Sequence, residues 1–104
     1  MLSPDELAAW NELPEESREP ALLRTWVAKE SWFKAAPAGA APWDFRLIAT
    51  QACDAAQANV RVWHVGPLFV GLCCADAQAL ARFVCEGLPE GEVDESCWRV
   101  GAAA

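Results

Sequence analysis

The hydrophobic pattern of this chain changes its period near Asn59, and this change constrains the fold more than any other feature. Before this point, apolar side chains recur every three to four residues, as on one face of a helix. After it, β-branched and aromatic residues stand in short runs separated by turn signals, which is typical of strands. The sequence therefore predicts helices first and a small sheet afterwards, in an α+β domain.

The first helix is predicted from its capping signals. Ser3 stands at the N-cap, Pro4 takes the first helical position, and Glu6 is placed to close a capping box. Pro14 cannot continue a helix, so the helix ends before it. We interpret the acidic run at residues 15–19 as a solvated connector.

A second helix is expected to begin near Pro20 and to end before Pro37. Its apolar residues fall on one side of a helical projection. Trp32 is the exception, because it lies about 100° from the centre of that stripe. This projection leaves Trp32 without a place in the core.

The segment from residue 43 to residue 58 allows two interpretations. Its first half, WDFRLIAT, is compatible with a strand, but apolar residues recur at helical spacing over the whole segment. We therefore predict a third helix, in which Trp43 and Leu47 share a side that points away from the apolar stripe. If residues 43–50 form a strand instead, the second half has the order βαββαβ of a ferredoxin-like fold.

The second half begins with a predicted β-hairpin. Its strands are residues 60–65 and 68–74, joined by a turn at Gly66-Pro67. The second strand is apolar on both faces, so we expect it to be covered on both faces or to lie centrally. Asp76 then caps a further helix.

The remaining residues complete the predicted domain. The last helix ends at Gly87, an acidic loop covers residues 88–95, and residues 96–100 form the last strand. The order is helix, helix, helix, strand, strand, helix, strand, with a three-stranded, mainly antiparallel sheet and about four helices. We expect a single domain over residues 1–101 and interpret residues 102–104 as a frayed tail or a cloning remnant.

The charge balance narrows the classes of partner. Fifteen acidic residues oppose eight basic ones, which gives a formal charge of −7. Binding to nucleic acid or to an anionic membrane surface needs clustered cations, so neither is expected. The sequence contains neither a secretion leader nor an apolar run long enough to span a membrane. These features favour a cytoplasmic location.

The sequence offers few candidate catalytic or metal-binding residues. Five cysteines make an odd number, so we interpret most of them as small buried hydrophobic residues kept reduced. No C-x-x-C pair or glycine-rich phosphate loop occurs, and we predict no metal ion and no cofactor. His64, the only histidine, would need a partner such as Cys73 or Cys74 to act as a general base.

Six tryptophans and no tyrosine are the most unusual part of the composition. Trp10 and Trp26 fit core stripes and Trp98 fits the sheet. Trp63 alternates with His64 along a strand, so one of the two should face outward. The predicted contact residues for a partner are those that the projections leave exposed or ambiguous: Trp32, Trp43, Leu47 and Trp63.

Two functional hypotheses follow. The first is a small, non-enzymatic protein-binding module of the regulator-antagonist, immunity or phage-inhibitor type. It would bind another protein, or a second copy of itself, through an exposed aromatic patch. The alternative is a small enzyme or ligand-binding domain that uses His64 and a nearby cysteine around an apolar pocket.

Overall fold

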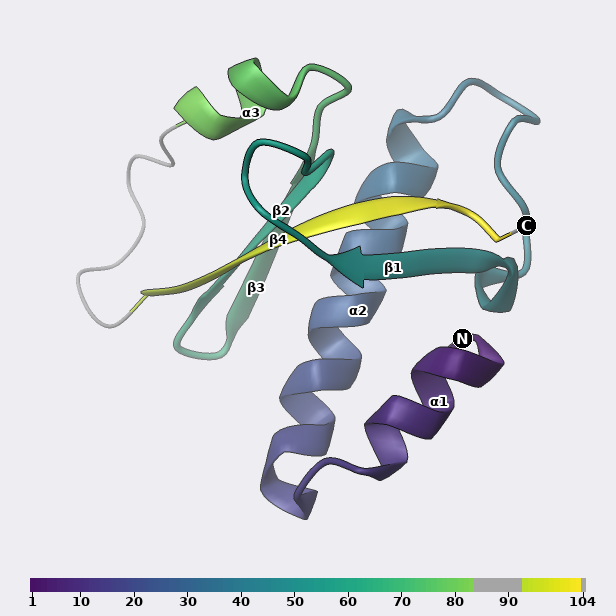
Figure 1. Cartoon of the computed structure of the whole chain (residues 1–104), viewed down its shortest axis with the longest axis vertical. Helices are drawn as coiled ribbons and strands as arrows, with labels where there is room; N and C mark the ends of the chain where they lie inside the picture. Colours follow the sequence, from purple (N-terminus) through teal and green to yellow (C-terminus); the bar gives the residue numbers. More distant parts are fainter. Residues whose placement is uncertain (84–92, 104) are drawn as a thin grey trace.

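The computed structural model describes residues 1–83 and 93–103. Within these residues it contains three α-helices and one four-stranded antiparallel sheet, which confirms the predicted α+β class (Figure 1). No helix in this part of the chain is long and apolar enough to cross a membrane. The elements are α1 (Pro4–Asn11), α2 (Glu15–Ala35), a 3-10 turn (Phe45–Leu47), β1 (Ile48–Ala52), β2 (Val60–Val65), β3 (Leu68–Cys73), α3 (Ala77–Arg82) and β4 (Val93–Ala102).

The sheet has the strand order β1-β4-β2-β3, so the last strand in sequence lies inside the sheet. The long helix α2 contacts all four strands. On the other face, the guanidinium of Arg61 donates hydrogen bonds to the carbonyl oxygens of Leu80 and Phe83 at the end of α3. The sheet is therefore covered by α2 on one face and partly by α3 on the other.

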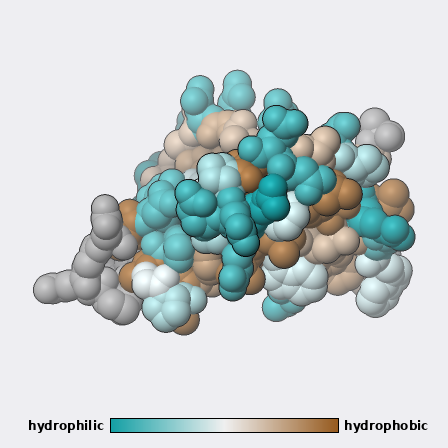
Figure 2. All heavy atoms as spheres, turned by 90° about the horizontal axis from the view of Figure 1, so that it is seen from below, coloured by the Kyte–Doolittle hydropathy of each residue, from teal (hydrophilic) through white to brown (hydrophobic). Residues whose placement is uncertain are grey.

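The core lies between α2 and the sheet. Its buried members come from α2 and three strands: Ala28, Ile48, Val60, Val62 and Val100. Half-buried side chains pack around them: Val27, Trp32, Phe33, Phe45, Phe69, Cys73 and Trp98. Outside this core, hydrophilic side chains gather over the middle of the lower face and hydrophobic ones flank them (Figure 2).

The predicted start of α1 is confirmed in detail. The Ser3 hydroxyl accepts a hydrogen bond from the Glu6 N–H at 3.2 Å, and the Ser3 N–H donates to Glu6 Oε1 at 2.9 Å. This reciprocal pair satisfies backbone donors that a helix start leaves free. The Asp76 cap of α3 is also confirmed, because its carboxylate accepts from the N–H groups of Gln78 and Ala79.

Helix α2 ends at Ala35, as its sequence predicts, but begins at Glu15 rather than near Pro20. The prediction of a connector at residues 15–19 is wrong. Acidic residues in a first helical turn interact favourably with the helix dipole. The Arg18 side chain also stabilises this turn, because it donates hydrogen bonds to the carbonyl oxygens of Asn11 and Leu13. The helix therefore runs through Pro20 despite its missing N–H.

The predicted third helix is wrong. Residues 45–47 form a 3-10 turn and residues 48–52 form β1, which pairs with β4. Ile48 is fully buried, so the strand is fixed by packing against distant residues rather than by its local helical period. The ferredoxin-like alternative anticipated a strand here, but residues 53–59 form no helix, so its βαββαβ order does not occur either.

The β2–β3 hairpin is confirmed, with Gly66 at φ 56° in its turn. The expected place of its second strand is wrong, because β3 lies at the edge of the sheet. Most β3 side chains are half-buried, and Leu68 is exposed. Only one face of this apolar strand is covered by α2.

The last strand is longer than residues 96–100. Gly101 and Ala102 pair with β1, and the Ala103 N–H donates to the Leu47 carbonyl oxygen at 2.7 Å. Residues 102 and 103 thus continue the sheet pairing rather than leave it as a tail. The predicted helix end at Gly87 and most of the acidic loop at residues 88–95 lie outside the described residues.

Candidate functional site

A groove of about 510 Å³ runs between the carboxyl-terminal half of α2 and the edge strand β3. It brings a carboxylate, an ammonium group and a hydroxyl together with apolar side chains. Its lining residues are Val27, Glu30, Ser31, Lys34, Ala35, Phe69, Gly71, Leu72 and Cys73.

The floor of this groove depends on a close approach of helix and strand at Gly71. A Cβ atom placed there would overlap the Ser31 hydroxyl and lie 2.6 Å from Val27 Cγ1. The Ser31 hydroxyl itself donates to the Val27 carbonyl oxygen at 2.7 Å. Glycine is therefore required by packing at this position, because any side chain would push α2 away from β3.

Glu30 and Lys34 carry the charges of the groove. They lie one helical turn apart, with Lys34 Nζ 3.6 Å from Glu30 Oε1. The Lys34 side chain is 74% exposed and the Glu30 side chain 37% exposed. An exposed pair at this distance contributes little to stability, so both groups remain available to a ligand.

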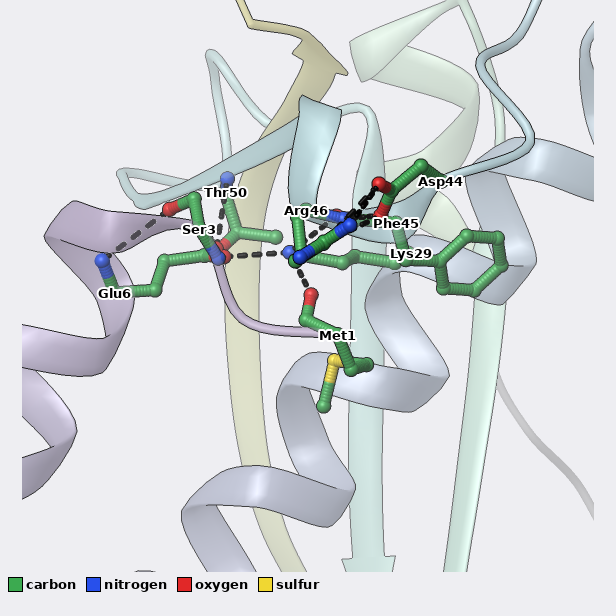
Figure 3. A network of polar contacts seen from close by, with 8 residues as sticks. All are labelled: Met1, Ser3, Glu6, Lys29, Asp44, Phe45, Arg46 and Thr50. Carbon is green, nitrogen blue, oxygen red and sulfur yellow. Dashed lines mark hydrogen bonds and ion pairs between the residues drawn. The ribbon is translucent and has the colours of Figure 1, made fainter.

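Lys29, the residue before Glu30, has a different environment (Figure 3). Its side chain is fully buried. Its Nζ donates to the carbonyl oxygens of Met1 and Phe45, each at 2.8 Å, and to Glu6 Oε1 at 2.5 Å. An ammonium group has three N–H donors, and all three are used within the protein.

Glu6 completes this buried cluster. Its Oε2 accepts hydrogen bonds from both the backbone N–H and the hydroxyl of Thr50 in β1. Burial is the largest influence on its pKa and raises it, but the hydrogen bonds from Lys29, Thr50 and Ser3 together outweigh burial and lower the pKa. The cluster connects α1, α2 and β1 through hydrogen bonds. Its charged groups have their partners within the protein, so they are not available to a substrate.

Comparison with known proteins identifies the family. A family model described as ACPS, the 4'-phosphopantetheinyl transferase superfamily, matches residues 1–93. The chain belongs to this superfamily. No curated protein and no solved structure matches it.

Membership of a transferase superfamily corrects the functional hypothesis. The prediction of a non-enzymatic inhibitor, immunity or antagonist module is wrong, because the match extends over most of the chain and names an enzyme family. The excess of tryptophan suggested a binding module, but an aromatic-rich composition does not distinguish a binding surface from an enzyme core.

The predicted contact residues do not form one patch in this superfamily member. Trp43 is 88% exposed and its ring lies 5.7 Å from that of Phe33, while Leu47 is also exposed. Trp32 is half-buried and packs against the core. Trp63 is buried on the α3 face, beside Arg61 and Phe83, so it offers no exposed surface to a partner.

Within the described residues, the alternative catalytic pair of His64 with Cys73 or Cys74 is not assembled. His64 stacks on Phe69, with ring centroids 4.0 Å apart. Cys73 faces Val60, four residues from His64 along β2, which is about 13 Å at strand spacing. Burial raises the pKa of the Cys73 thiol, which disfavours a reactive thiolate. Among residues 1–83 and 93–103, no three metal-binding side chains converge.

Sequence reasoning missed Glu30, Ser31 and Lys34. Polar residues on an amphipathic helix ordinarily face solvent, so their residue types alone did not indicate a site. One available signal was the distribution of lysine: both lysines of the chain, Lys29 and Lys34, lie at one end of one helix. The contribution of Gly71 could not be found without the pairing of β3.

Proposed function

We propose that the groove between α2 and β3 binds the phosphate end of a 4'-phosphopantetheine donor, and that the chain acts in transfer of that group. The superfamily match carries this proposal. The groove supports it, because it presents Glu30, Ser31 and Lys34 beside an apolar lining. A suitable donor is a phosphoanhydride of 4'-phosphopantetheine such as coenzyme A.

The transfer exchanges one phosphorus–oxygen bond for another. An acceptor hydroxyl loses its proton and forms a bond to the phosphorus atom that carries the pantetheine arm. The anhydride bond to the same phosphorus atom breaks, and the nucleotide phosphate leaves with its electron pair. Because negative charge is spread over the phosphate oxygens, catalysis depends on positioning and on electrostatic stabilisation. Lys34 Nζ, exposed at the groove, supplies a positive charge for these oxygens.

Glu30 fits a second requirement of phosphoryl transfer. Enzymes of this chemistry bind Mg²⁺ through one or two carboxylates together with the phosphates of the substrate. The exposed Glu30 carboxylate, one helical turn from Lys34, would hold the ion against the donor phosphates. When bound, the ion neutralises phosphate charge and thereby favours the leaving group.

The apolar part of the donor has a suitable surface nearby. A second cavity of about 300 Å³, lined mainly by apolar residues, shares Ala35 and Cys73 with the groove. Trp32 and Pro37 are also among its lining residues. A phosphate held at Lys34 would leave the pantetheine arm free to extend over this lining.

Calorimetric titration with coenzyme A, with and without MgCl₂, tests this proposal. Lys34→Met should weaken binding about tenfold under both conditions, because a charge-assisted contact is lost. Glu30→Gln should abolish the increase in affinity caused by MgCl₂. It should not weaken metal-free binding, because it removes a negative charge beside the donor phosphates. Glu19→Gln, on an exposed part of the same helix, is the matched control. Absence of coenzyme A binding, or equal effects of all three variants, would overturn the proposal.

A protein partner and a cytoplasmic location, both expected from composition, remain part of the proposal. The exposure of Trp43 and Leu47 supports a contact of these two residues with another protein. The acidic balance of the chain continues to disfavour nucleic acid and anionic membranes.

A further inference from the structure

Two cysteines that are distant in sequence face each other at one end of the sheet. Cys53 directly follows β1, and Cys97 lies in β4 next to Trp98, which pairs with the last residue of β1. The Cys53 N–H donates to the Cys97 carbonyl oxygen at 3.1 Å. The printed register of β1 and β4 ends with Ala52 opposite Trp98, and this hydrogen bond places Cys53 opposite Cys97 as the next pair.

This pairing suits a covalent cross-link. Hydrogen-bonded partners in an antiparallel pair have Cα atoms about 5.5 Å apart and side chains on the same face. A disulfide joins Cα atoms that are roughly 4.4–6.8 Å apart, so no large backbone movement is required. The pKa of the Cys53 thiol is raised by burial and by the neighbouring Cys97, which agrees with their proximity. The raised pKa keeps this thiol mostly protonated at neutral pH, so its reaction with a peroxide should be faster under alkaline conditions.

The two thiols are also accessible. Both residues are half-buried rather than enclosed. An open cavity of about 580 Å³ lies beside Cys53 and is lined by Gln51, Asp54 and Arg99 among others. A small oxidant can therefore reach this end of the sheet. The other described cysteines, Cys73 and Cys74, are consecutive in sequence and lie near the groove edge instead.

We propose that Cys53 and Cys97 form a reversible cross-strand disulfide when the protein meets a peroxide. One thiolate attacks hydrogen peroxide, which gives a sulfenic acid and releases the first water once a proton is taken up. The second thiolate attacks the sulfenic sulfur, forms the S–S bond and expels hydroxide, which takes up a proton to give the second water. Two thiols are thus oxidised while one peroxide is reduced to two waters.

The cross-link would fasten the edge strand β1 to β4 and enclose residues 53–97, which include β2, β3 and α3. Closing so long a loop restricts the unfolded chain, so the oxidised protein should be more stable. We expect its Tm to rise by on the order of 10 °C. Reduction with dithiothreitol should reverse the rise.

Peptide mapping tests the proposal directly. Reduced protein is treated with hydrogen peroxide at mildly alkaline pH, where the thiolate fraction is larger. Digestion with trypsin and a glutamate-specific protease places Cys53 and Cys97 in peptides without another cysteine. We expect these two peptides to be joined, with the mass of the intact chain lowered by two hydrogens.

Three variants complete the experiment. Cys53→Ser and Cys97→Ser should each abolish both the joined peptide and the rise in Tm. Cys73→Ser, the control, should retain both. A reduced variant with a wild-type circular dichroism spectrum shows that loss of the link is not loss of folding. Links through other cysteines, oxidation to sulfinic acid without a link, or an unchanged Tm would each overturn the proposal. None of these outcomes depends on coenzyme A binding.

Discussion

Lys29 and Glu30 are consecutive on α2, yet the protein uses their charges in different ways. The Lys29 side chain is fully buried, with each of its three donors bonded to an acceptor of the protein. Glu30 lies in an open groove and has one long, exposed ion pair with Lys34. A helix turns by about 100° per residue, so adjacent positions face different surroundings. A charged group whose hydrogen bonds are all made within the protein has a structural role. A charged group with few internal partners is available to a ligand.

The largest expected effect comes from removing the buried charge. Lys29→Met leaves the Glu6 carboxylate half-buried without its cation and two carbonyl oxygens without a donor. Breaking a buried pair in this way costs about 3–5 kcal/mol of unfolding free energy. Urea denaturation followed by circular dichroism measures the loss.

Lys34→Met is the matched control, because it removes the same group from an exposed position. Its unfolding free energy should change by less than about 0.5 kcal/mol. Adding Glu6→Gln to Lys29→Met should recover part of the loss, since no uncompensated carboxylate remains. Similar losses for Lys29→Met and Lys34→Met would remove the distinction between the two sites.

The next largest effect is expected in the groove, where packing rather than charge sets the geometry. Gly71→Ala places a methyl group against Ser31 and Val27, which should cost about 1–3 kcal/mol and weaken coenzyme A binding. Gly101→Ala is a matched control in β4, because no atom lies within 4 Å of its new Cβ. Combining Gly71→Ala with Val27→Ala and Ser31→Ala should restore part of the stability. If Gly71→Ala melts like Gly101→Ala, the helix and strand are not in close contact.

The same comparison shows what the sequence could predict. Capping by Ser3 and Glu6 is local, so its signal lies within four residues and was found. That Glu6 also binds Lys29 and Thr50 depends on the fold, and no local pattern contains it. Strand β1 was mistaken for a helix because its pairing partner, β4, lies about fifty residues further along the chain.

The candidate site was less predictable than the fold for the same reason. Glu30 and Lys34 are four residues apart and could have been noticed as a pair. Their functional setting arises only when Gly71 allows β3 to approach α2. Trp63 was counted among the candidate contact residues because strand alternation does not say which face is covered, and α3 covers its face.

A smaller effect is expected from acid. The folded-state pKa of Glu6 lies below the ordinary value of 4.5, so its ionised form stabilises the fold above that pH. This contribution should be lost as the pH falls from 4.5 through the lowered pKa. In the Glu6→Gln variant, the unfolding free energy should fall less on acidification than in the wild type. Some decrease remains because other carboxylates still titrate. Unfolding free energies measured from pH 6 to pH 3 check this, and parallel curves for both proteins would contradict it.

The smallest change in unfolding free energy is expected for a substitution of Trp43. This residue extends the comparison of buried and exposed groups to aromatic side chains. Trp43 is 88% exposed, so Trp43→Ala should change the unfolding free energy by less than about 0.5 kcal/mol. Trp63→Ala is the matched variant in the core and should cost about 3–5 kcal/mol. A loss above about 1 kcal/mol for Trp43→Ala would mean that its contact with Phe33 stabilises the fold. A neutral result would show that Trp43, like Glu30, is not needed for folding, and weakened association of Trp43→Ala with another protein would then assign Trp43 to the proposed contact surface.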